Sequence, residues 1–395
     1  MNLLEVIKNA SVDPKLHDSP PDYPLVINAD NIIQNVKPER EEEVSSSSIL
    51  KPLTGWNILQ TVSEQIAICN KFFVELKTQL KTSDFDKGKF VSSLNSYLEN
   101  IRDSVGVSIG IDSSNHDYTK VLIDRLHFFI PKNVAGPILE GCVSLEIWEL
   151  VQTLIVNGII EPSGYSNLVS SLVEKRRSDL LCLCIRHTSD LGSSEMLCIL
   201  RYFLSPPKDA FDSMEIVRKE WESQALLALE KAKDSKGKKF LLAKEAAGLL
   251  MLAHDGFSRS ELCLHYFFAS SNINRDMLSP TLSKLNGKEM MQLIRYLTKW
   301  LRKYQRFPQV GPCPNASATF GLKACDWVPK LEVVGKCLGF VLDANFASLV
   351  MHPEFHEELR LADDIVSSLR DEAKFCCMLA EVGDKLLGES KGEKK

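Results

Sequence analysis

Two histidines near the C-terminus have the spacing of a helical zinc pair. His352 and His356 are four residues apart in the run His-Pro-Glu-Phe-His, and imidazoles at this spacing share one face of a helix. The hydrolytic form of the motif has Glu directly after the first His, whereas Pro353 stands there. Because no third ligand is identifiable, we interpret the run as a helix start with Pro353 at the first position. The sequence predicts no metal site.

The cysteines also lack the spacing of a metal centre. Neither Cys182-Leu-Cys184 nor Cys376-Cys377 has the two-residue gap that closes a tetrahedral site. Most cysteines lie among Leu, Ile, Val and Phe, which is typical of small core residues in a reducing compartment. We therefore predict reduced, buried thiols at Cys69, Cys142, Cys182, Cys184, Cys198, Cys263, Cys337, Cys376 and Cys377.

Two further motifs resemble active-site sequences but are incomplete. Gly287-Lys288 is followed by Glu289, where a phosphate-binding loop has Ser or Thr. Ser166 lies in Gly-Tyr-Ser-Asn-Leu, which lacks the second Gly of a nucleophile elbow. We therefore predict no catalytic residue, no cofactor and no small-molecule substrate, and we predict that the protein is not an enzyme.

Cationic side chains form two clusters. One is a stripe along a predicted helix at 287–305, where the spacing of mostly three, four or seven residues places the cations opposite the apolar positions. Its members are Lys288, Arg295, Lys299, Arg302 and, just past the helix end, Arg306. The other cluster is Lys231, Lys233, Lys236, Lys238 and Lys239.

Two interpretations of these cations remain open. They can contact RNA phosphates, with Trp300 and Tyr304 stacking on bases. Alternatively they form a solvated face that pairs with the last predicted helix, which is rich in Asp and Glu. The second interpretation is favoured, because the two aromatic residues fit the buried stripe better. The candidate RNA or partner contacts are Lys288, Arg295, Lys299, Arg302, Arg306, Lys236, Lys238 and Lys239.

The composition is that of an ordinary globular protein. Of 395 residues, 44% are hydrophobic and 25% charged, and the formal net charge of −5 disfavours electrostatic wrapping of nucleic acid. No apolar run approaches the roughly 18 residues of a membrane helix, and the first residues lack the pattern of a secretory signal. We expect no membrane contact and a location inside the cell.

The elements that must position these residues are helices. Apolar residues recur every three or four positions from about Thr54 onward, first along 59–80. Ser258 with Glu261, Asn286 with Glu289 and Asp212 with Glu215 have capping-box spacing. Gly and Pro, including Gly136-Pro137 and Pro280, are predicted to separate the helices. Further helices are expected at about 87–104, 117–130, 143–157, 163–174, 178–187, 193–204, 212–234, 239–254, 258–270, 275–285, 287–305, 329–351 and 353–383.

These patterns predict an all-α fold. No repeat of fixed period is found, so we expect an irregular α-solenoid of stacked helical hairpins with a disordered N-terminal arm. The expected parts are a mostly disordered acidic, Ser- and Pro-rich arm at 1–52, a helical array at 53–305, an irregular loop at 306–328, a helical pair packed on the array at 329–383 and a charged flexible tail at 384–395.

The C-terminal third resembles the nucleolar protein eleven family. The segment 333–354 is similar to the helical signature of that family, in which a Leu-Asp-Ala-His/Asn-Phe run is followed by Pro-Glu and a final long helix. The segment Arg295–Tyr304 is similar to another helix of the family. The resemblance covers about 258–382, whereas 54–257 agree only in being helical. Family members generally carry a β-propeller ahead of this region, and no regularly spaced strands occur in the present sequence.

The resemblance implies a subunit of the UtpA (t-UTP) complex of the small-subunit processome. Such a protein acts in the nucleus and nucleolus in rDNA transcription, rRNA processing and ribosome biogenesis. Its partners would be other protein subunits of a nucleolar assembly complex, with pre-rRNA as a further candidate. Helices with apolar faces left over after hairpin pairing suit a scaffold that works by protein–protein interaction. The alternative is a cytoplasmic helical-repeat adaptor for trafficking or ubiquitin machinery.

Overall fold

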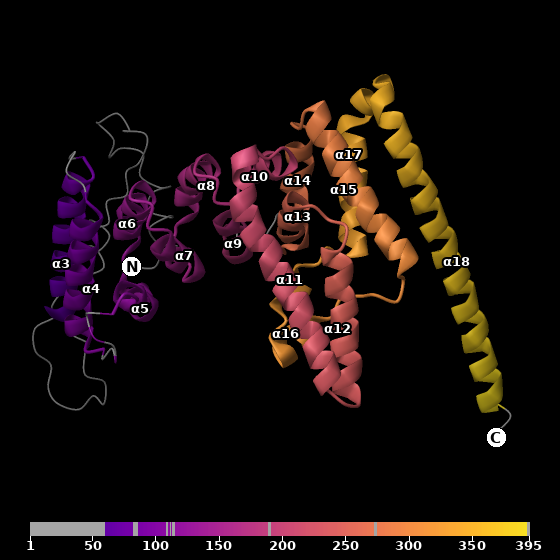
Figure 1. The fold of residues 1–395 in the computed structure, drawn as a ribbon, viewed down its shortest axis with the longest axis horizontal. Helices are drawn as coiled ribbons and strands as arrows, with labels where there is room; N and C mark the ends of the chain where they lie inside the picture. Colours follow the sequence, from indigo (N-terminus) through magenta and orange to yellow (C-terminus); the bar gives the residue numbers. More distant parts are fainter. Residues whose placement is uncertain are drawn as a thin grey trace, which may run out of the picture. The chain divides into compact units, whose positions relative to one another are not determined.

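The computed structural model describes residues 60–81, 86–107, 110, 112, 115–188, 191–271 and 275–392. The chain divides into two units, Met1–Ser63 and Glu64–Lys395, and nearly all described residues belong to the second. Within the described residues the structure is helical and has no strand, which confirms the predicted all-α class (Figure 1). The arm predicted at 1–52 lies outside the described residues.

Sixteen α-helices and five short 3₁₀ segments make up the described chain. The α-helices are α3 (Gln60–Gln79), α4 (Lys87–Val105), α5 (Tyr118–Leu126), α6 (Lys132–Ser144), α7 (Trp148–Val156), α8 (Tyr165–Glu174), α9 (Ser178–His187), α10 (Ser193–Leu204), α11 (Phe211–Asp234), α12 (Lys238–His254), α13 (Arg259–Ala269), α14 (Arg275–Leu282), α15 (Gly287–Arg306), α16 (Pro314–Phe320), α17 (Leu331–Met351) and α18 (His356–Gly392). The 3₁₀ segments are η1 (His127–Phe129), η2 (Pro162–Gly164), η3 (Lys208–Ala210), η4 (Lys323–Trp327) and η5 (Pro353–Phe355).

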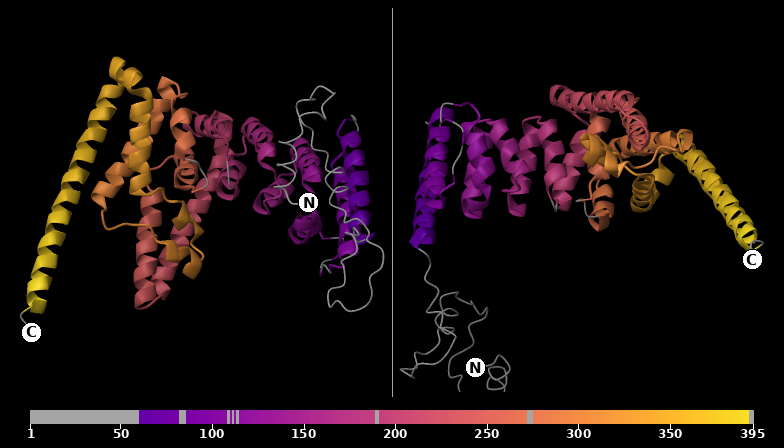
Figure 2. Two further views of the ribbon diagram at one scale, coloured as in Figure 1. Left: turned by 180° about the vertical axis from the view of Figure 1, so that it is seen from behind. Right: turned by 90° about the horizontal axis from the view of Figure 1, so that it is seen from below.

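Neighbouring helices pack as stacked hairpins. Helix α4 contacts α5, α5 and α6 contact α7, and α7 and α8 contact α9. Figure 2 shows these helices side by side in chain order. Further along, α11 and α12 form a hairpin, and α13, α14 and α15 each contact α17. One continuous set of buried apolar residues runs from α3 to α18, as expected when each hairpin buries its apolar face against the next.

Three helix ends in this stack share one backbone motif. After α6, α7 and α8, the second residue beyond the helix cap donates its amide to the carbonyl five residues back, at 2.8 to 3.2 Å. The residue before it is left-handed in each case: Glu146 (φ 54), Gly158 (φ 64) and Arg176 (φ 58). These are Schellman ends. Ion pairs then join every second connection: Lys175 after α8 to Glu146 after α6 at 2.7 Å, and Arg176 after α8 to Asp209 after α10 at 3.1 Å. The sequence does not reveal this repeated helix end, because three different residue types, Glu, Gly and Arg, adopt the same left-handed conformation.

Several predicted boundaries are wrong. Gly136-Pro137 does not separate helices but lies inside α6, where Pro137 is buried. Proline has no amide hydrogen to donate to the carbonyl of Asn133, and Asn133 is an exposed residue. Pro280 likewise lies inside α14. The segment 306–328 is not a continuous irregular loop, because α16 and η4 lie within it. Burial of Ala316 and Cys325 explains why this segment orders.

Two other boundary predictions also fail. Helix α18 continues to Gly392, so the flexible tail expected from 384 is helical up to that residue. Asp212 does not cap α11, because η3 runs directly into the helix and Glu215 forms an ion pair with Arg259 instead. The capping boxes predicted at Ser258 and Asn286 are confirmed.

The stretch Lys323–Met351 is long and apolar enough to cross a membrane by length and composition alone. Its helix α17 contacts α13, α14 and α15, and Val334 and Val341 are fully buried. These contacts place part of α17 in the core of the array, whereas 33% of its most apolar 18-residue window is buried. The expected lack of membrane contact stays a prediction.

Candidate interaction surfaces

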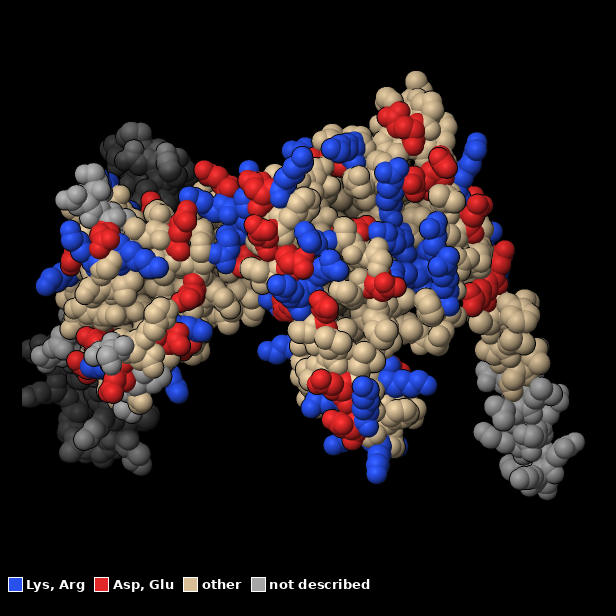
Figure 3. All heavy atoms as spheres, viewed as in Figure 1, with Lys and Arg blue, Asp and Glu red and all other residues tan. Residues whose placement is uncertain are grey.

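The cationic stripe lies on α15, and part of it is held by internal contacts. Lys288, Arg295, Arg302 and Arg306 are exposed, whereas Lys299 is partly buried. Figure 3 shows Lys and Arg gathered over α15 and at the end of the α11–α12 hairpin. The opposite face of α15 is buried, as the periodicity predicts.

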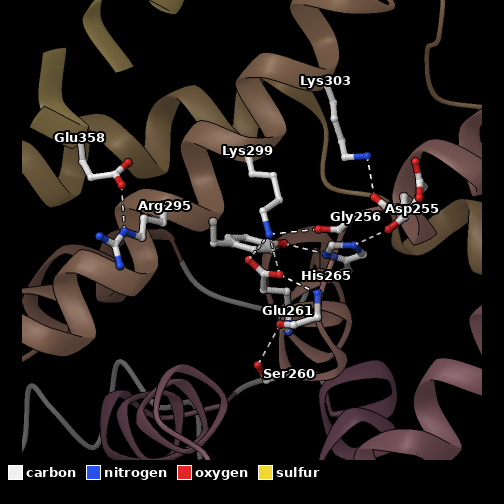
Figure 4. A network of polar contacts seen from close by, with 12 residues as sticks. Asp255, Gly256, Ser260, Glu261, His265, Arg295, Lys299, Lys303 and Glu358 are labelled. Carbon is white, nitrogen blue, oxygen red and sulfur yellow. Dashed lines mark hydrogen bonds and ion pairs between the residues drawn. The ribbon is translucent and has the colours of Figure 1, made fainter. Parts of the chain in front are cut away.

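Lys299 is tied to the start of helix α13. Its Nζ lies 2.7 Å from Glu261 Oε1 and 3.1 Å from the Gly256 carbonyl oxygen (Figure 4). Glu261 also accepts the Ser258 amide at 2.6 Å in the predicted capping box. Lys299 therefore fixes the connection between α12 and α13 and has little freedom to bind an external phosphate.

Lys303, one turn further along α15, holds the end of helix α12. Its Nζ lies 2.8 Å from the Leu252 carbonyl oxygen and 2.7 Å from that of Asp255 (Figure 4). Burial lowers the pKa of Lys303, an effect that the Asp255 charge partly offsets and the Lys299 charge adds to. The last carbonyls of a helix have no partner within the helix, so an ammonium group supplies one. Sequence reasoning missed Lys303, although it lies four residues from Lys299.

Arg295 joins α15 to the last helix. Its Nε lies 2.9 Å from Glu358 Oε1 on α18 (Figure 4). This contact is the pairing with the acidic last helix that the second interpretation expected. Lys288, Arg302 and Arg306 form no ion pair with other described residues. The stripe thus combines structural contacts and free cations.

The aromatic residues of α15 are enclosed. Trp300 is fully buried and Tyr304 nearly so, and the Tyr304 hydroxyl donates to the Pro329 carbonyl at 2.6 Å. Both rings belong to a cluster with Phe257 and His265. They cannot stack on nucleic-acid bases, so the part of the RNA interpretation that needed aromatic stacking is wrong.

His265 is a fully buried ionisable group beside α15. Its ring nitrogens lie 2.9 Å from the Tyr296 hydroxyl and 2.9 Å from the Ala253 carbonyl oxygen. Burial lowers its pKa to about 3, partly offset by the Ala253 carbonyl. A neutral imidazole closed in by aromatic rings stabilises the core and has no access to a substrate.

The second basic cluster is at the end of the α11–α12 hairpin. Lys236, Lys238 and Lys239 are exposed, and none of them forms an ion pair with the residues that the structure describes. Lys233 is also exposed and Lys231 partly so. In the α15 stripe Arg295 and Lys299 have internal partners, whereas no lysine of this cluster has an ion-pair partner among the described residues.

The motif that carries the family resemblance surrounds a kink in α17. Asn345 is buried and has non-helical backbone angles (φ −125, ψ 17). Its Nδ2 donates to the Val341 carbonyl at 3.1 Å and to the Leu282 carbonyl at 3.4 Å. The kink therefore fixes α17 against α14, and the next residue, Phe346, is 69% exposed.

Large exposed apolar side chains are concentrated in α17 and α18. Met351, at the end of α17, is 77% exposed. Sequence reasoning did not find this surface, although the apolar run Phe375–Ala380 within an acidic helix was a signal for it. The exposed large apolar residues of the two helices are Leu331, Phe346, Val350, Met351, Leu361, Val366, Phe375, Met378, Leu379 and Val382.

The cysteines and histidines that were predicted not to bind a metal include both buried and exposed side chains. Seven of the nine cysteines predicted as buried are buried or partly buried, whereas Cys376 and Cys377 are exposed, because α18 extends beyond its neighbours there. The His356 ring lies 3.0 Å from the Val350 carbonyl oxygen. Among the described residues no group of three or more His, Cys, Asp or Glu is arranged to hold a metal ion. The absence of a metal stays a prediction.

A wide groove lies between α3, α6 and α8. Among the described residues that line it, Lys77 and Glu140 are charged and the others are apolar, amide or hydroxyl.

Comparison of the chain with protein-family models and with curated proteins finds no match. The surfaces described above are therefore the basis for assigning a function.

Proposed function

We propose that this protein is a non-catalytic scaffold subunit that acts in ribosome biogenesis in the nucleolus. In this proposal it belongs to the small-subunit processome and supports pre-rRNA transcription and processing. The observation that carries the scaffold role is the exposed apolar surface of α17 and α18. Large exposed apolar side chains gathered on neighbouring helices are typical of protein interaction sites. The resemblance of 258–382 to the nucleolar protein eleven family supports the nucleolar location.

The surroundings of the buried ionisable groups support a role without catalysis. Burial raises the pKa of the Cys184 thiol to about 12, and it lowers the pKa of His265 to about 3. A thiol of this pKa is not a nucleophile near neutral pH, and a neutral histidine enclosed by aromatic rings cannot exchange protons with a substrate.

The docking test compares two exposed apolar sites. The double variant Phe346→Glu and Met351→Glu places two charges in the proposed contact. In a pull-down from nuclear extract, its recovery of nucleolar assembly factors should fall at least tenfold. Phe128, in η1, is 84% exposed and serves as the matched control, because Phe128→Glu changes a distant surface. Recovery of the unchanged protein without any nucleolar assembly factor would contradict the proposal.

Localisation separates this proposal from the cytoplasmic adaptor. A tagged full-length chain should concentrate in nucleoli. Diffuse cytoplasmic signal, together with recovery of trafficking or ubiquitin factors, would favour the adaptor.

If the scaffold contacts pre-rRNA, we propose that the hairpin lysines make the contact. They are free, whereas Lys299 and Lys303 on α15 hold internal carbonyls. Each phosphate neutralised on single-stranded RNA contributes about 0.7 to the slope of log K against log salt. A variant with four Lys→Gln substitutions should therefore lower that slope by up to about 2.8. The substituted residues are Lys233, Lys236, Lys238 and Lys239. Gln at the exposed Lys71, Lys120, Lys132 and Lys208 is the control of equal charge, and an equal loss in both variants would sink the assignment.

A further inference from the structure

The middle part of α18, from 371 to 382, is exposed on all sides. In the first half of α18, Ala362 and Ile365 are buried, and α18 contacts α15. Every residue from 371 to 382 is exposed. In Figure 3 this part of the helix shows mainly uncharged atoms. A helix with so much apolar surface in water is expected to acquire a partner.

Four large apolar side chains form one stripe on this exposed part. Phe375, Met378, Leu379 and Val382 are each 54 to 57% exposed. Their spacings of three, one and three residues place them on one face of the helix. The order of these spacings is the same in both directions along the chain. Two copies of the stripe that run in opposite directions therefore have their apolar side chains at matching heights.

We propose that the occupant of this stripe is α18 of a second copy of this chain, packed antiparallel. In that arrangement Phe375 faces Val382 of the partner subunit, and Met378 faces Leu379 of the partner subunit. A two-fold axis between the helices makes the same four residues complementary on both sides. Each large side chain then covers one of the four positions of the other helix.

Charges beside the stripe favour the antiparallel direction. Lys374 and Glu381 are seven residues apart, so they lie on the same flank of the helix, and neither forms an ion pair with other described residues. In the antiparallel dimer Lys374 lies beside Glu381 of the partner subunit, and the reverse pair forms by symmetry. A parallel dimer would instead place this flank of the two helices on opposite sides of the pair, so that Lys374 and Glu381 of one copy could not contact those of the other. Opposite charges across the flanks select the antiparallel pairing.

The same charges argue against a lipid surface as the occupant. Helices that lie on membranes have polar faces rich in Lys and Arg. Here Asp371, Glu372 and Glu381 accompany Arg370 and Lys374, so the polar residues of 370–382 carry more negative than positive charge. The short stripe predicts a reversible dimer that depends on concentration, because few apolar side chains offset the entropy of association.

The first experiment measures the mass of the purified full chain by sedimentation equilibrium over a hundredfold range of concentration. The chain should shift from monomer to dimer, and Leu379→Glu should stay monomeric throughout. Leu226→Glu is the matched control, since Leu226 on α11 is 55% exposed, and it should dimerise like the unchanged chain. Val382→Glu repeats the test at a second position, and circular dichroism checks that each variant keeps its helix content.

A charge exchange tests the direction of the helices. Lys374→Glu alone and Glu381→Lys alone should each weaken dimerisation at least fivefold, because each places like charges together. The double variant should return to within twofold of the unchanged chain, because both reciprocal pairs form again with the charges exchanged.

Three outcomes would overturn the proposal. One is a monomer at every concentration, including the case in which the chain binds vesicles or a foreign helix through this stripe. Another is a dimer that Leu379→Glu leaves intact. The third is a double charge variant weaker than either single one. Because purified protein alone is used, failure of the dimer leaves the proposed scaffold function untouched, and failure of the pull-down leaves the dimer untouched.

Discussion

Helices α15 and α18 have similar sequence patterns but very different surroundings. Both are long, charged on one side and apolar on another. The apolar face of α15 is closed by α13, α17 and α18, with Leu293, Ile294 and Trp300 fully buried. In α18 beyond Leu369, by contrast, Phe375, Met378, Leu379 and Val382 are each 54 to 57% exposed. An amphipathic pattern therefore shows that a helix face needs a partner, but not whether the chain itself provides one.

The largest effect on stability is expected when one aromatic side chain is removed from each helix. Trp300→Ala in α15 should lower the free energy of unfolding by about 3 to 5 kcal/mol, because it leaves a large cavity in a packed core. Phe375→Ala in α18 should change it by less than about 0.5 kcal/mol, measured at concentrations where the chain is monomeric. Urea denaturation of both variants measures the two values. A similar loss for both would mean that α18 is packed as firmly as α15.

The pH dependence of stability sharpens the description of the core beneath α15. The pKa of His265 is lowered to about 3 from 6.5. The unfolded chain therefore binds a proton that the folded chain excludes, and stability is complete above about pH 6.5 and falls as pH decreases toward 3. Between pH 7 and pH 4 the loss from this group is about 3 kcal/mol, at 1.36 kcal/mol for each pKa unit.

The control for this pH effect is His265→Gln, which has no imidazole to protonate. Its stability should be lower at neutral pH, but its decrease between pH 7 and pH 4 should be smaller than that of the unchanged chain. Equal slopes for the two proteins would show that His265 is accessible to protons in the folded state.

The two kinds of cation on α15 provide a third test. Lys303→Met removes the ammonium group from the carbonyls of Leu252 and Asp255, so stability should fall by about 1 to 3 kcal/mol. Arg302→Met changes an exposed cation without an ion-pair partner among the described residues, and it should change stability by less than about 0.5 kcal/mol. Thermal unfolding of the two variants gives the comparison, which fails if Arg302→Met is the more damaging.

The smallest expected effect concerns the contact between the two helices themselves. Arg295 and Glu358 are partly exposed, so a double-mutant cycle with Arg295→Gln and Glu358→Gln should give a coupling of about 0.2 to 1 kcal/mol. The coupling should decrease as salt increases. A coupling of zero at low salt would show that the first half of α18 does not hold this position against α15 in solution.

Much of the fold could be predicted from local pattern. The apolar periodicity located most helices, and Ser258 and Asn286 marked two helix starts through side chains that reach only three residues. Proline rules failed at Pro137, because burial of the ring in the stack outweighs one lost backbone hydrogen bond. The end of α18 was misplaced, because charged residues after Val382 indicated a tail although the helix continues.

The candidate site was predicted less well, because the role of a charged side chain depends on what lies opposite it. The stripe from Lys288 to Arg306 was correctly placed on one exposed face. Its division into structural and free cations depends on carbonyls at Leu252, Asp255 and Gly256, which are about fifty residues away in the chain. No local pattern contains that information.

Sequence alone determined that this protein is all-α, that α15 buries Trp300 and Tyr304, and that two clusters of cations lie outside the core, because side-chain direction in a helix follows from spacing. Tertiary structure decided which lysines hold helix ends, where Asn345 bends α17, and which apolar face stays open. These features depend on contacts between residues far apart in the chain, and such contacts form only when the helices have stacked.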